Sequence, residues 1–366
     1  MILLALLRYK AVFQQEVSFM DTKIWVVNNF DEQLESNPQI IEAAKLLSNN
    51  EVVAFPTETV YGLGANASSD EAVAKIFEAK GRPSDNPLIV HIAHSEQLTN
   101  IAVDIPEFVD VLIKEFWPGP LTLVLKKKNG AVGEKVTAGL ETIAVRMPDH
   151  PIALALIKVA NLPLAAPSAN LSGKPSPTVA KHVITDLNGR ISAIIDGGST
   201  GVGLESTVLD CTADIPVILR PGGVTKEQLE ALIGKISIDH SLFEDGQAPK
   251  SPGMKYTHYA PKSPLTVVFG SPQFLQRLVD KQKMAGLRVG VLATEETKDS
   301  YQADTTLVCG LRADLPSVAS QLYDVLRTFD EKSVDIIYSE SFPQDGVGQA
   351  IMNRLLKAAG NEVIHE

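Results

Sequence analysis

The stretch KGRPSDNPLIVHI, residues 80–92, places two cations, two prolines and a histidine around one turn that leads into an apolar strand. The residues before it, SSDEAVAKIFEAKG (68–81), begin with N-cap residues and end on glycine, which predicts a helix. Residues 88–92 predict a buried strand. A helix that passes through a stiff turn into a buried strand indicates an α/β fold.

Strand-like and helix-like segments alternate on both sides of this stretch. Up to residue 234 the sequence predicts strands at 22–28, 51–57, 88–92, 121–127, 142–148, 162–170, 193–198, 206–212 and 216–222, and helices at 38–50, 68–81, 105–117, 150–161, 178–189 and 225–234. Further strands are predicted at 265–270, 287–294, 305–310 and 334–340, with helices between them and a last helix at 346–360. The first region favours an α/β sheet with parallel and antiparallel pairing, and the second a small Rossmann-like α/β domain.

The boundaries follow from composition. Residues 240–264 are rich in Pro, Gly, Ser and Lys without a period, which is typical of a linker. We therefore expect an extension at 1–21, a first domain at 22–238, a linker at 239–264 and a second domain at 265–366. The apolar run MILLALL at the N-terminus has no preceding positive region and is too short to span a membrane, so we expect neither a signal peptide nor an anchor, and Met20 is an alternative start.

Composition excludes several classes of function. The net charge of −11 argues against nucleic-acid binding by the whole surface. Cys211 and Cys309 are far apart and form no CxxC, which excludes a cysteine-rich zinc module or a disulfide framework and suits a reducing cytoplasm. There is no P-loop motif and no HExxH motif, and the GxG at 346–348 reads better as a helix start than as a nucleotide loop.

Polar residues gather beside several predicted strands. Residues 56–67, PTETVYGLGANA, offer hydroxyls and glycines to a ligand, with a plain turn as the alternative. Lys80 and Arg82 stand two apart, so in an extended segment stiffened by Pro83 and Pro87 they would face one way. Such a pair of cations needs an anion between them, unless the turn is simply solvated.

Further candidates lie within or at the ends of strands. His91 is either a core histidine or a ligand contact, and Arg146 needs an anion unless it reaches solvent at a sheet edge. The remaining candidates are Ser168, Asn170, Ser206, Thr207 and Arg220. Cations with a set of hydroxyls and an amide suit a polyanion and a small polar co-substrate, as in phosphoryl or nucleotidyl transfer.

The motifs PTETVYGLGANA, KGRPSDNPLIVHI, WPGPLTLVL, AVRMPDHP, PLAAPSANLSGKPSPT, GLESTVLD and ILRPGG occur in this order. Together they resemble the YrdC-like threonylcarbamoyl-AMP synthase family over residues 24–235. SPGMKYTHYAPKSP (251–264) and the region after it resemble the long, two-domain form of that family. The resemblance implies a twisted mixed sheet with helices and a concave basic cleft, followed by the small Rossmann-like domain.

The resemblance also implies a reaction. L-Threonine, bicarbonate or CO2, and ATP would give L-threonylcarbamoyladenylate and pyrophosphate, the first step of t6A modification at position 37 of tRNA. Mg²⁺ is expected with the ATP, held mainly by phosphates. Downstream tRNA threonylcarbamoyl-transfer proteins are the implied partners, with weak RNA binding as a further expectation, no membrane contact and a cytoplasmic location.

The family's functional residues carry over by motif. Lys80, Arg82, Ser168 and Asn170 match the catalytic set. The implied ATP contacts are Arg82, Asn86, Thr142, Ser168, Ser176 and Arg220. The implied threonine contacts are Thr59, His91, Arg146, the backbone of Ala166, and Ser206. Arg146 would bind the threonine carboxylate, since a guanidinium binds carboxylates bidentately. No residue is an obvious covalent nucleophile, so the chemistry would rest on orientation and charge neutralisation.

The linker carries a hypothesis of its own. Lys255, Tyr256, His258 and Tyr259 lie between prolines, and we expect this segment to fold back over the nucleotide with Tyr259 touching ATP. The alternative is that its tyrosines pack between the two domains. Two other functions stay open: an RNA-binding module of the same fold, and a hydrogenase maturation factor, which would need zinc-finger cysteines that this chain lacks.

Overall fold

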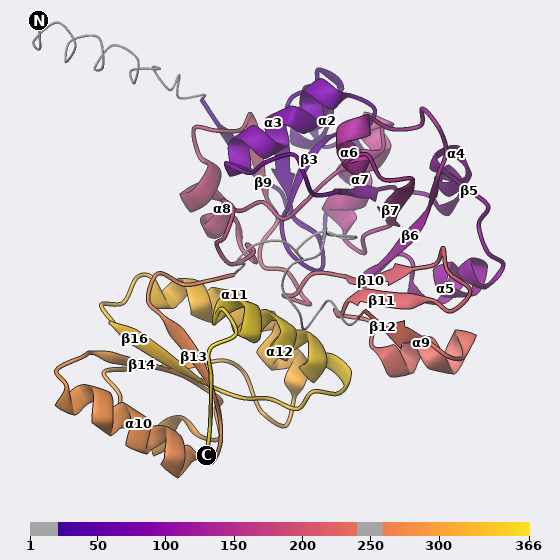
Figure 1. Cartoon of the computed structure of the whole chain (residues 1–366). Helices are drawn as coiled ribbons and strands as arrows, with labels where there is room; N and C mark the ends of the chain where they lie inside the picture. The colour runs from indigo at the N-terminus through magenta and orange to yellow at the C-terminus, as the bar shows by residue number, and fades with distance from the viewer. Residues whose placement is uncertain (1–20, 240–258) are drawn as a thin grey trace, which may run out of the picture.

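The computed structural model of the chain describes residues 21–239 and 259–366, which form two β-sheets flanked by helices (Figure 1). We refer to residues 21–239 as the N-terminal part and to residues 259–366 as the C-terminal part. The predicted extension, except for residue 21, and residues 240–258 of the predicted linker lie outside the described residues. Within the described ranges, no helix combines the length and the apolar character needed to cross a membrane.

Twelve strands make up the sheet of the N-terminal part. They are β1 (Lys23–Val26), β2 (Val53–Phe55), β3 (Gly62–Asn66), β4 (Ile89–His91), β5 (Ala102–Val103), β6 (Leu121–Lys127), β7 (Thr142–Arg146), β8 (Leu164–Ala165), β9 (Ala193–Asp196), β10 (Thr207–Asp210), β11 (Val217–Arg220) and β12 (Ser237–Ile238). Their order is β1-β9-β2-β3-β8-β4-β7-β6-β10-β11-β12, and β5 pairs with β6. Pairs such as β4 with β7 are parallel and pairs such as β6 with β7 antiparallel, so the predicted mixed sheet is confirmed.

The N-terminal part contains the six predicted helices and two short α-helices that were not predicted. They are α2 (Pro38–Ser48), α3 (Asp70–Lys80), α4 (Leu98–Ile101), α5 (Phe108–Phe116), α6 (Glu134–Thr137), α7 (Pro151–Ala160), α8 (Ala180–Leu187) and α9 (Lys226–Ile233). The Ser69 side chain accepts a hydrogen bond from the backbone N–H of Ala72 at the start of α3. Gly81 ends α3 in the left-handed region, with φ of 62°, a conformation that costs glycine little.

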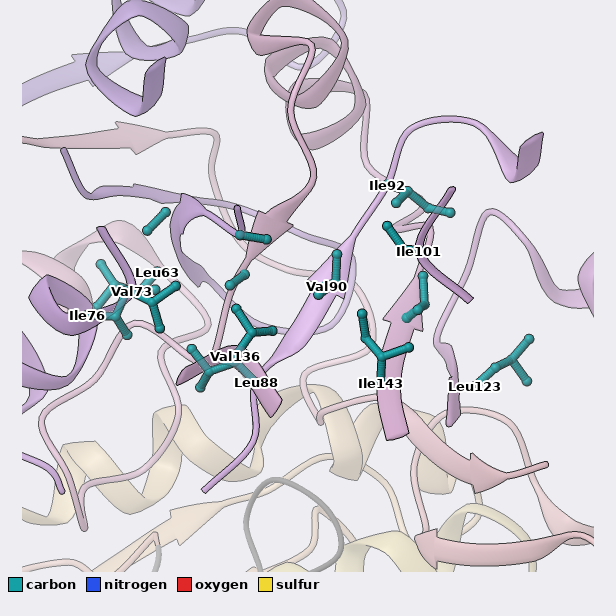
Figure 2. Packing of buried hydrophobic residues seen from close by; sticks show 14 of the residues in the cluster. Leu63, Val73, Ile76, Leu88, Val90, Ile92, Ile101, Leu123, Val136 and Ile143 are labelled. Carbon is teal, nitrogen blue, oxygen red and sulfur yellow. The ribbon is translucent and has the colours of Figure 1, made fainter. Parts of the chain in front are cut away.

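Strand β9 shows how the sheet separates two layers of core, because successive side chains of a strand point to opposite faces. Ile194 packs into the cluster that contains α3 and α8, whereas its neighbours Ala193 and Ile195 pack into the cluster that contains α2 and α7. Figure 2 shows part of the first cluster, with Val73 of α3 beside Leu63 of β3. Burial of apolar area on both faces fixes the sheet and holds the strand ends that carry the polar candidates.

The C-terminal part is a five-stranded sheet whose strand pairs are all parallel. Its elements are β13 (Leu265–Phe269), α10 (Pro272–Met284), β14 (Val289–Ala293), β15 (Thr305–Val308), α11 (Leu315–Phe329), β16 (Ile336–Glu340), α12 (Gly346–Ala358) and β17 (Val363–His365). The strand order is β15-β14-β16-β13-β17. Helix α10 covers one face, and α11 and α12 cover the face toward the N-terminal part (Figure 1). This arrangement is the Rossmann-like pattern that the sequence predicts.

The two parts pack closely against each other. Val60 and Leu204 of the N-terminal part belong to the same apolar cluster as α11 and α12. A Cβ atom at Gly203, which has φ of 77°, would lie 2.4 Å from Cα of Ser320 in α11, so only glycine allows this approach. The backbone N–H of Ala260 also donates to the carbonyl of Gly173 at 3.1 Å.

Some elements differ from the sequence predictions. Residues 62–66 of the stretch expected to present hydroxyls form strand β3, and the short strands β5, β12 and β17 were not predicted. Lys80 belongs to α3 and not to an extended segment, so the expectation that Lys80 and Arg82 face one way by strand alternation was wrong. The glycines at 346–348 begin α12, as the alternative of a helix start predicts.

Candidate functional site

A cavity of about 70 Å³ lies at the edge of the N-terminal sheet where β4 and β7 end. His91 and Arg146 are the last residues of these strands and are direct partners in the parallel register. The predicted site residues that line the cavity are Thr59, Lys80, Arg82, His91, Arg146, Ala166, Ser168, Asn170, Ser206, Arg220 and Tyr259. The fold therefore brings all the predicted threonine contacts and part of the predicted ATP contacts to one place.

Three of the predicted ATP contacts do not line this cavity. Thr142 begins β7 at the opposite end of the strand from Arg146. Asn86 is fully buried, and neither atom of its side-chain amide has a hydrogen-bond partner among the described residues. Ser176 is also fully buried, and it contacts the cavity through Glu205, to which its hydroxyl donates at 2.5 Å. The roles of these three residues stay predictions.

Lys80 and Arg82 reach the cavity by a different route from the one expected. Lys80 ends α3, and the left-handed Gly81 turns the chain so that Arg82 lines the same cavity. Lys80 Nζ donates to the carbonyls of Ser168 at 2.5 Å and Asn170 at 2.8 Å. Burial and the neighbouring Arg82 lower the pKa of Lys80 to about 7. Lys80 and Arg82 therefore lie at the same cavity, as expected, but Lys80 loses its proton near neutral pH.

The loop after β8 supplies the hydroxyl and amide groups. Ser168 Oγ donates to Asn170 Oδ1 at 2.6 Å. Asn170 Nδ2 donates to the carbonyls of Leu171 and Lys174 at 2.8 and 2.9 Å. These bonds, with those from Lys80, fix the loop against the end of α3. The expectation that Ser168 and Asn170 lie together is confirmed by their direct contact.

The anion that pairs with Arg146 is the side chain of Glu58 in the same chain. Arg146 Nη2 lies 2.5 Å from Glu58 Oε1, Nη1 donates to Thr59 Oγ1 at 2.9 Å, and Nε donates to the carbonyl of Gly119 at 3.1 Å. Arg146 is only 3% exposed, so the alternative of a side chain that reaches solvent was wrong. Glu58 was not singled out from the sequence, although it stands within PTETVYG.

His91 is a neutral hydrogen-bonding group. Burial and the charge of Arg146 lower the pKa of His91 to about 3, so it carries no charge at neutral pH. Its Nδ1 lies 3.2 Å from the carbonyl of Ile89, which must accept, so Nδ1 carries the proton. Nε2 is then an acceptor that can receive a hydrogen bond from a hydroxyl group.

Arg220 ends β11 and is held beside the start of β10. Its Nε donates to the carbonyl of Ser206 at 3.1 Å, and its Nη2 to Ser206 Oγ at 3.2 Å. Ser206 Oγ lies 2.7 Å from Thr122 Oγ1. This side of the cavity is therefore an ordered cluster of one guanidinium and two hydroxyls.

Glu205 is the main residue of the cavity that the sequence reasoning missed. It lines the cavity beside Ser206, is 7% exposed, and binds Arg354 of α12, Tyr323 of α11 and Ser176. A carboxylate at the start of a predicted buried strand, in the motif GLESTVLD, was the available signal. Because Glu58 and Glu205 lie beside Arg146 and Arg220, the cavity is less basic than its cations alone suggest.

Tyr259 lines the cavity from the end of the linker. It is 4% exposed and its ring lies 5.0 Å from that of Tyr323. The guanidinium of Arg354 lies 5.9 Å from the same ring. Lys255, Tyr256 and His258 lie outside the described residues. Tyr259 therefore both lines the cavity and packs between the two parts, so the two alternatives stated for it from the sequence do not exclude each other.

Comparison with known proteins agrees with this arrangement. The family described as "Telomere recombination" matches residues 45–222, and that described as "Threonylcarbamoyl-AMP synthase, C-terminal domain" matches residues 224–360. The threonylcarbamoyl-AMP synthase of Bacillus subtilis is 61% identical over 94% of this chain and all of the relative. The chain belongs to the threonylcarbamoyl-AMP synthase family.

Other members of this family share the whole architecture. The threonylcarbamoyl-AMP synthase of Pyrococcus abyssi is 48% identical over 93% of this chain and 99% of its own length. A crystal structure of Pyrococcus abyssi Sua5 complexed with L-threonine covers 94% of this chain and all of the solved chain, with a TM-score of 0.88 and 48% identity. The resemblance stated from the motifs is thereby confirmed, and so is the two-domain form.

Proposed function

We propose that the chain is an L-threonylcarbamoyladenylate synthase. It converts L-threonine, bicarbonate or CO2, and ATP into threonylcarbamoyl-AMP and pyrophosphate, the first step of t6A37 formation in tRNA. The observation that carries the proposal is that all five predicted threonine contacts and four of the seven predicted ATP contacts line one cavity of a chain that belongs to this family. The downstream tRNA threonylcarbamoyl-transfer proteins and a cytoplasmic location remain expectations.

The chemistry assigns one side of the cavity to each substrate. Lys80, Arg82 and Arg220 are the cations for the phosphates of ATP. Thr59, His91 and Arg146 surround threonine, whose carboxylate would share Arg146 with Glu58 or displace Glu58 from it. The threonine amine adds to CO2 and releases a proton. A carbamate oxygen then attacks the α-phosphorus, and pyrophosphate leaves with the electron pair of the broken P–O bond.

The protein contributes orientation and charge neutralisation to these steps. No covalent intermediate is needed, since the carbamate is itself the nucleophile. The cavity of about 70 Å³ is smaller than the ~300–1,000 Å³ of small-molecule pockets. Residues around the cavity therefore have to move when both substrates bind.

Magnesium would enter with ATP. Within residues 21–239 and 259–366, no group of three His, Cys, Asp or Glu side chains could hold a metal ion. The carboxylate at the cavity, Glu205, is already bound by Arg354. We therefore assign magnesium mainly to the phosphates of ATP and not to a protein cage.

A direct test of the function measures which substrates pyrophosphate release requires and whether the carbon of bicarbonate enters the product. Pyrophosphate release should require L-threonine, bicarbonate and ATP together, and mass spectrometry should find ¹³C from labelled bicarbonate in threonylcarbamoyl-AMP. Pyrophosphate release that does not depend on threonine or bicarbonate would refute the proposal.

A salt-dependent RNA shift without ATP turnover would favour the RNA-binding alternative. Against that alternative, Lys80, Arg146 and Arg220 are all at most 5% exposed, which places them out of reach of an RNA backbone.

Lys80 gives a prediction about pH. Its pKa of about 7 means that it is mostly neutral at pH 8 in the free protein. Phosphates placed beside it favour the charged form, so binding of a nonhydrolysable ATP analogue at pH 8 should take up close to one proton. Calorimetry in buffers with different ionisation enthalpies measures this uptake. Lys80→Met should abolish it, and equal uptake by that variant would show that another group titrates.

The same shift has a consequence for stability. The ordinary pKa of Lys80 is 10.5, so between about pH 7 and 10.5 the unfolded chain holds a proton here that the folded chain lacks. The free energy of unfolding therefore rises with pH across this window and gains nothing more above it. Below about pH 7 both states are protonated, and the full cost of burying the charge remains.

Tyr259 is predicted to retain the labile product. Tyr259→Ala should lower the yield of intact threonylcarbamoyl-AMP several-fold relative to the pyrophosphate released, because water then reaches the mixed anhydride. Tyr259→Phe keeps the ring on Tyr323 and is the control. The ratio of the two products is measured by mass spectrometry. Full product yield from Tyr259→Ala would leave the segment as a connector only.

A further inference from the structure

A buried ion pair joins the C-terminal part to the cavity. Arg354 of α12 is fully buried, and its Nε lies 2.8 Å from Oε2 of Glu205. Tyr323 of α11, also fully buried, donates to the same carboxylate, with distances of 3.1 and 2.9 Å to its two oxygens. Ser176 Oγ completes the set at 2.5 Å from Oε1. The carboxylate thus takes hydrogen bonds from both parts of the chain.

The protonation states in this cluster are defined. Burial alone would raise the pKa of Glu205, but Arg354, Arg220 and Ser176 outweigh it and lower the pKa to about 2. Burial and the charge of Glu205 raise the pKa of Tyr323, so its hydroxyl keeps the proton that it donates. Glu205 is therefore an anion at every physiological pH, and all its partners are donors.

Stabilisation of the fold does not by itself explain why Glu205 and Arg354 form a buried ion pair. Removing two charges from water costs about as much as their attraction returns, so apolar side chains would join the two parts at least as well. Glu205, however, lines the cavity that we assign to ATP, where an uncompensated carboxylate would repel the phosphates. The charge of Arg354 cancels that repulsion from a position outside the cavity lining.

Glu205 also orients two groups of the nucleotide side. It accepts the hydroxyl proton of Ser176 and interacts electrostatically with Arg220, which is itself bound to Ser206. A change in the position of Glu205 would therefore displace one predicted ATP contact and remove the counter-charge of another. No residue of α11 or α12 lines the cavity, so these helices act on it through the lining residues that they contact, Glu205 and Tyr259.

We propose that Arg354 and Tyr323 of the C-terminal part are positioning residues for the nucleotide half of the site. They neutralise and orient Glu205, which in turn holds Ser176 and Arg220 for ATP. This inference rests on the proposed function for the identity of the ligand. It gives the C-terminal part a role in the reaction that short proteins with the N-terminal part alone would have to fill in another way.

The test compares ATP and threonine in the full-length chain. Arg354→Met leaves the Glu205 charge uncompensated, and we expect the KM for ATP to rise about tenfold, the loss of roughly one charge-assisted contact, with the KM for threonine within about twofold. Arg354→Lys should recover part of the difference. The double variant Glu205→Gln/Arg354→Met removes both charges and should bind ATP better than Arg354→Met alone.

The control is another ion pair between the two parts. Lys181 of α8 and Glu331 lie 2.8 Å apart, and both are exposed. Lys181→Met breaks this pair and should leave the KM for ATP unchanged. An equal KM for ATP in Arg354→Met and wild type, or a double variant that binds ATP no better than Arg354→Met, would overturn the inference.

Two further measurements distinguish a failure of the positioning role from misfolding of Arg354→Met and from a failure of the proposed function. If Arg354→Met does not fold, Tyr323→Phe removes only a hydroxyl, and it should still raise the KM for ATP a few-fold; no rise would overturn the inference. Calorimetric binding of a nonhydrolysable ATP analogue reports on the positioning without turnover. A wild type that binds the analogue but releases no threonine-dependent pyrophosphate would refute the proposed function, while weaker binding by Arg354→Met would still support the positioning role.

Discussion

Valine should be used at least about 10⁴-fold less efficiently than threonine, measured as kcat/KM for pyrophosphate release. The two side chains have nearly the same shape, so the difference must come from the hydroxyl. The groups around the predicted threonine position are polar and closed off from water: Thr59, His91 and Ser206 are at most 4% exposed. His91 is neutral and offers Nε2 as an acceptor. Thr59 and Ser206 are already hydrogen-bonded within the chain, so valine would leave the Nε2 acceptor of His91 without its partner.

Serine is the internal control for this prediction. It keeps the hydroxyl and lacks one methyl group, so its kcat/KM should fall by only about 10–200-fold. The order threonine, serine, valine would show that the site recognises the hydroxyl. Comparable rates with valine and threonine would contradict the assignment of Thr59, His91 and Ser206 to threonine.

Arg82→Ala should lower turnover by about 10–150-fold while the fold persists. A charge-assisted hydrogen bond contributes roughly 1.5–3 kcal/mol, which corresponds to that range. Arg82 lines the cavity beside Lys80, and it keeps its charge where Lys80 is partly neutral. At pH 8 Arg82 is therefore charged before ATP binds, whereas Lys80 becomes charged only when the phosphates bind beside it.

Two variants make this measurement specific. Arg82→Lys keeps a positive charge and should fall between wild type and Arg82→Ala. Arg190→Ala removes an exposed arginine after α8 and should leave both turnover and the melting temperature unchanged. Activity of Arg82→Ala within about twofold of wild type would remove Arg82 from the ATP contacts.

The sequence was most informative where a local pattern sets the structure. Ser69 and Gly81 cap α3 as predicted, because capping depends on residues within one turn of the helix. The convergence of His91, Arg146 and Ser168 was also predictable, although it depended on the family motifs. Residue spacing alone suggested an extended segment at Lys80, whereas the helix continues to that residue.

Partners that are distant in sequence could not be predicted. Glu58 neutralises Arg146 across 88 positions, and Arg354 reaches Glu205 across 149. No periodicity or spacing encodes such contacts, since they depend on the order of strands and on the packing of one part against the other. The sequence indicated that a buried arginine needs an anion, but not which carboxylate supplies it.

The ionised state of Glu205 also determines what Ser176 can recognise. A carboxylate can only accept hydrogen bonds, so the single proton of the Ser176 hydroxyl is committed to Glu205. While that bond holds, Ser176 can offer a nucleotide only its oxygen lone pairs. Its partner would then have to be a donor, such as a ribose hydroxyl or an amino group of the base, because a phosphate oxygen would be repelled. Through Arg354 of α12, the C-terminal part would thus determine whether Ser176 donates or accepts a hydrogen bond when it contacts the nucleoside.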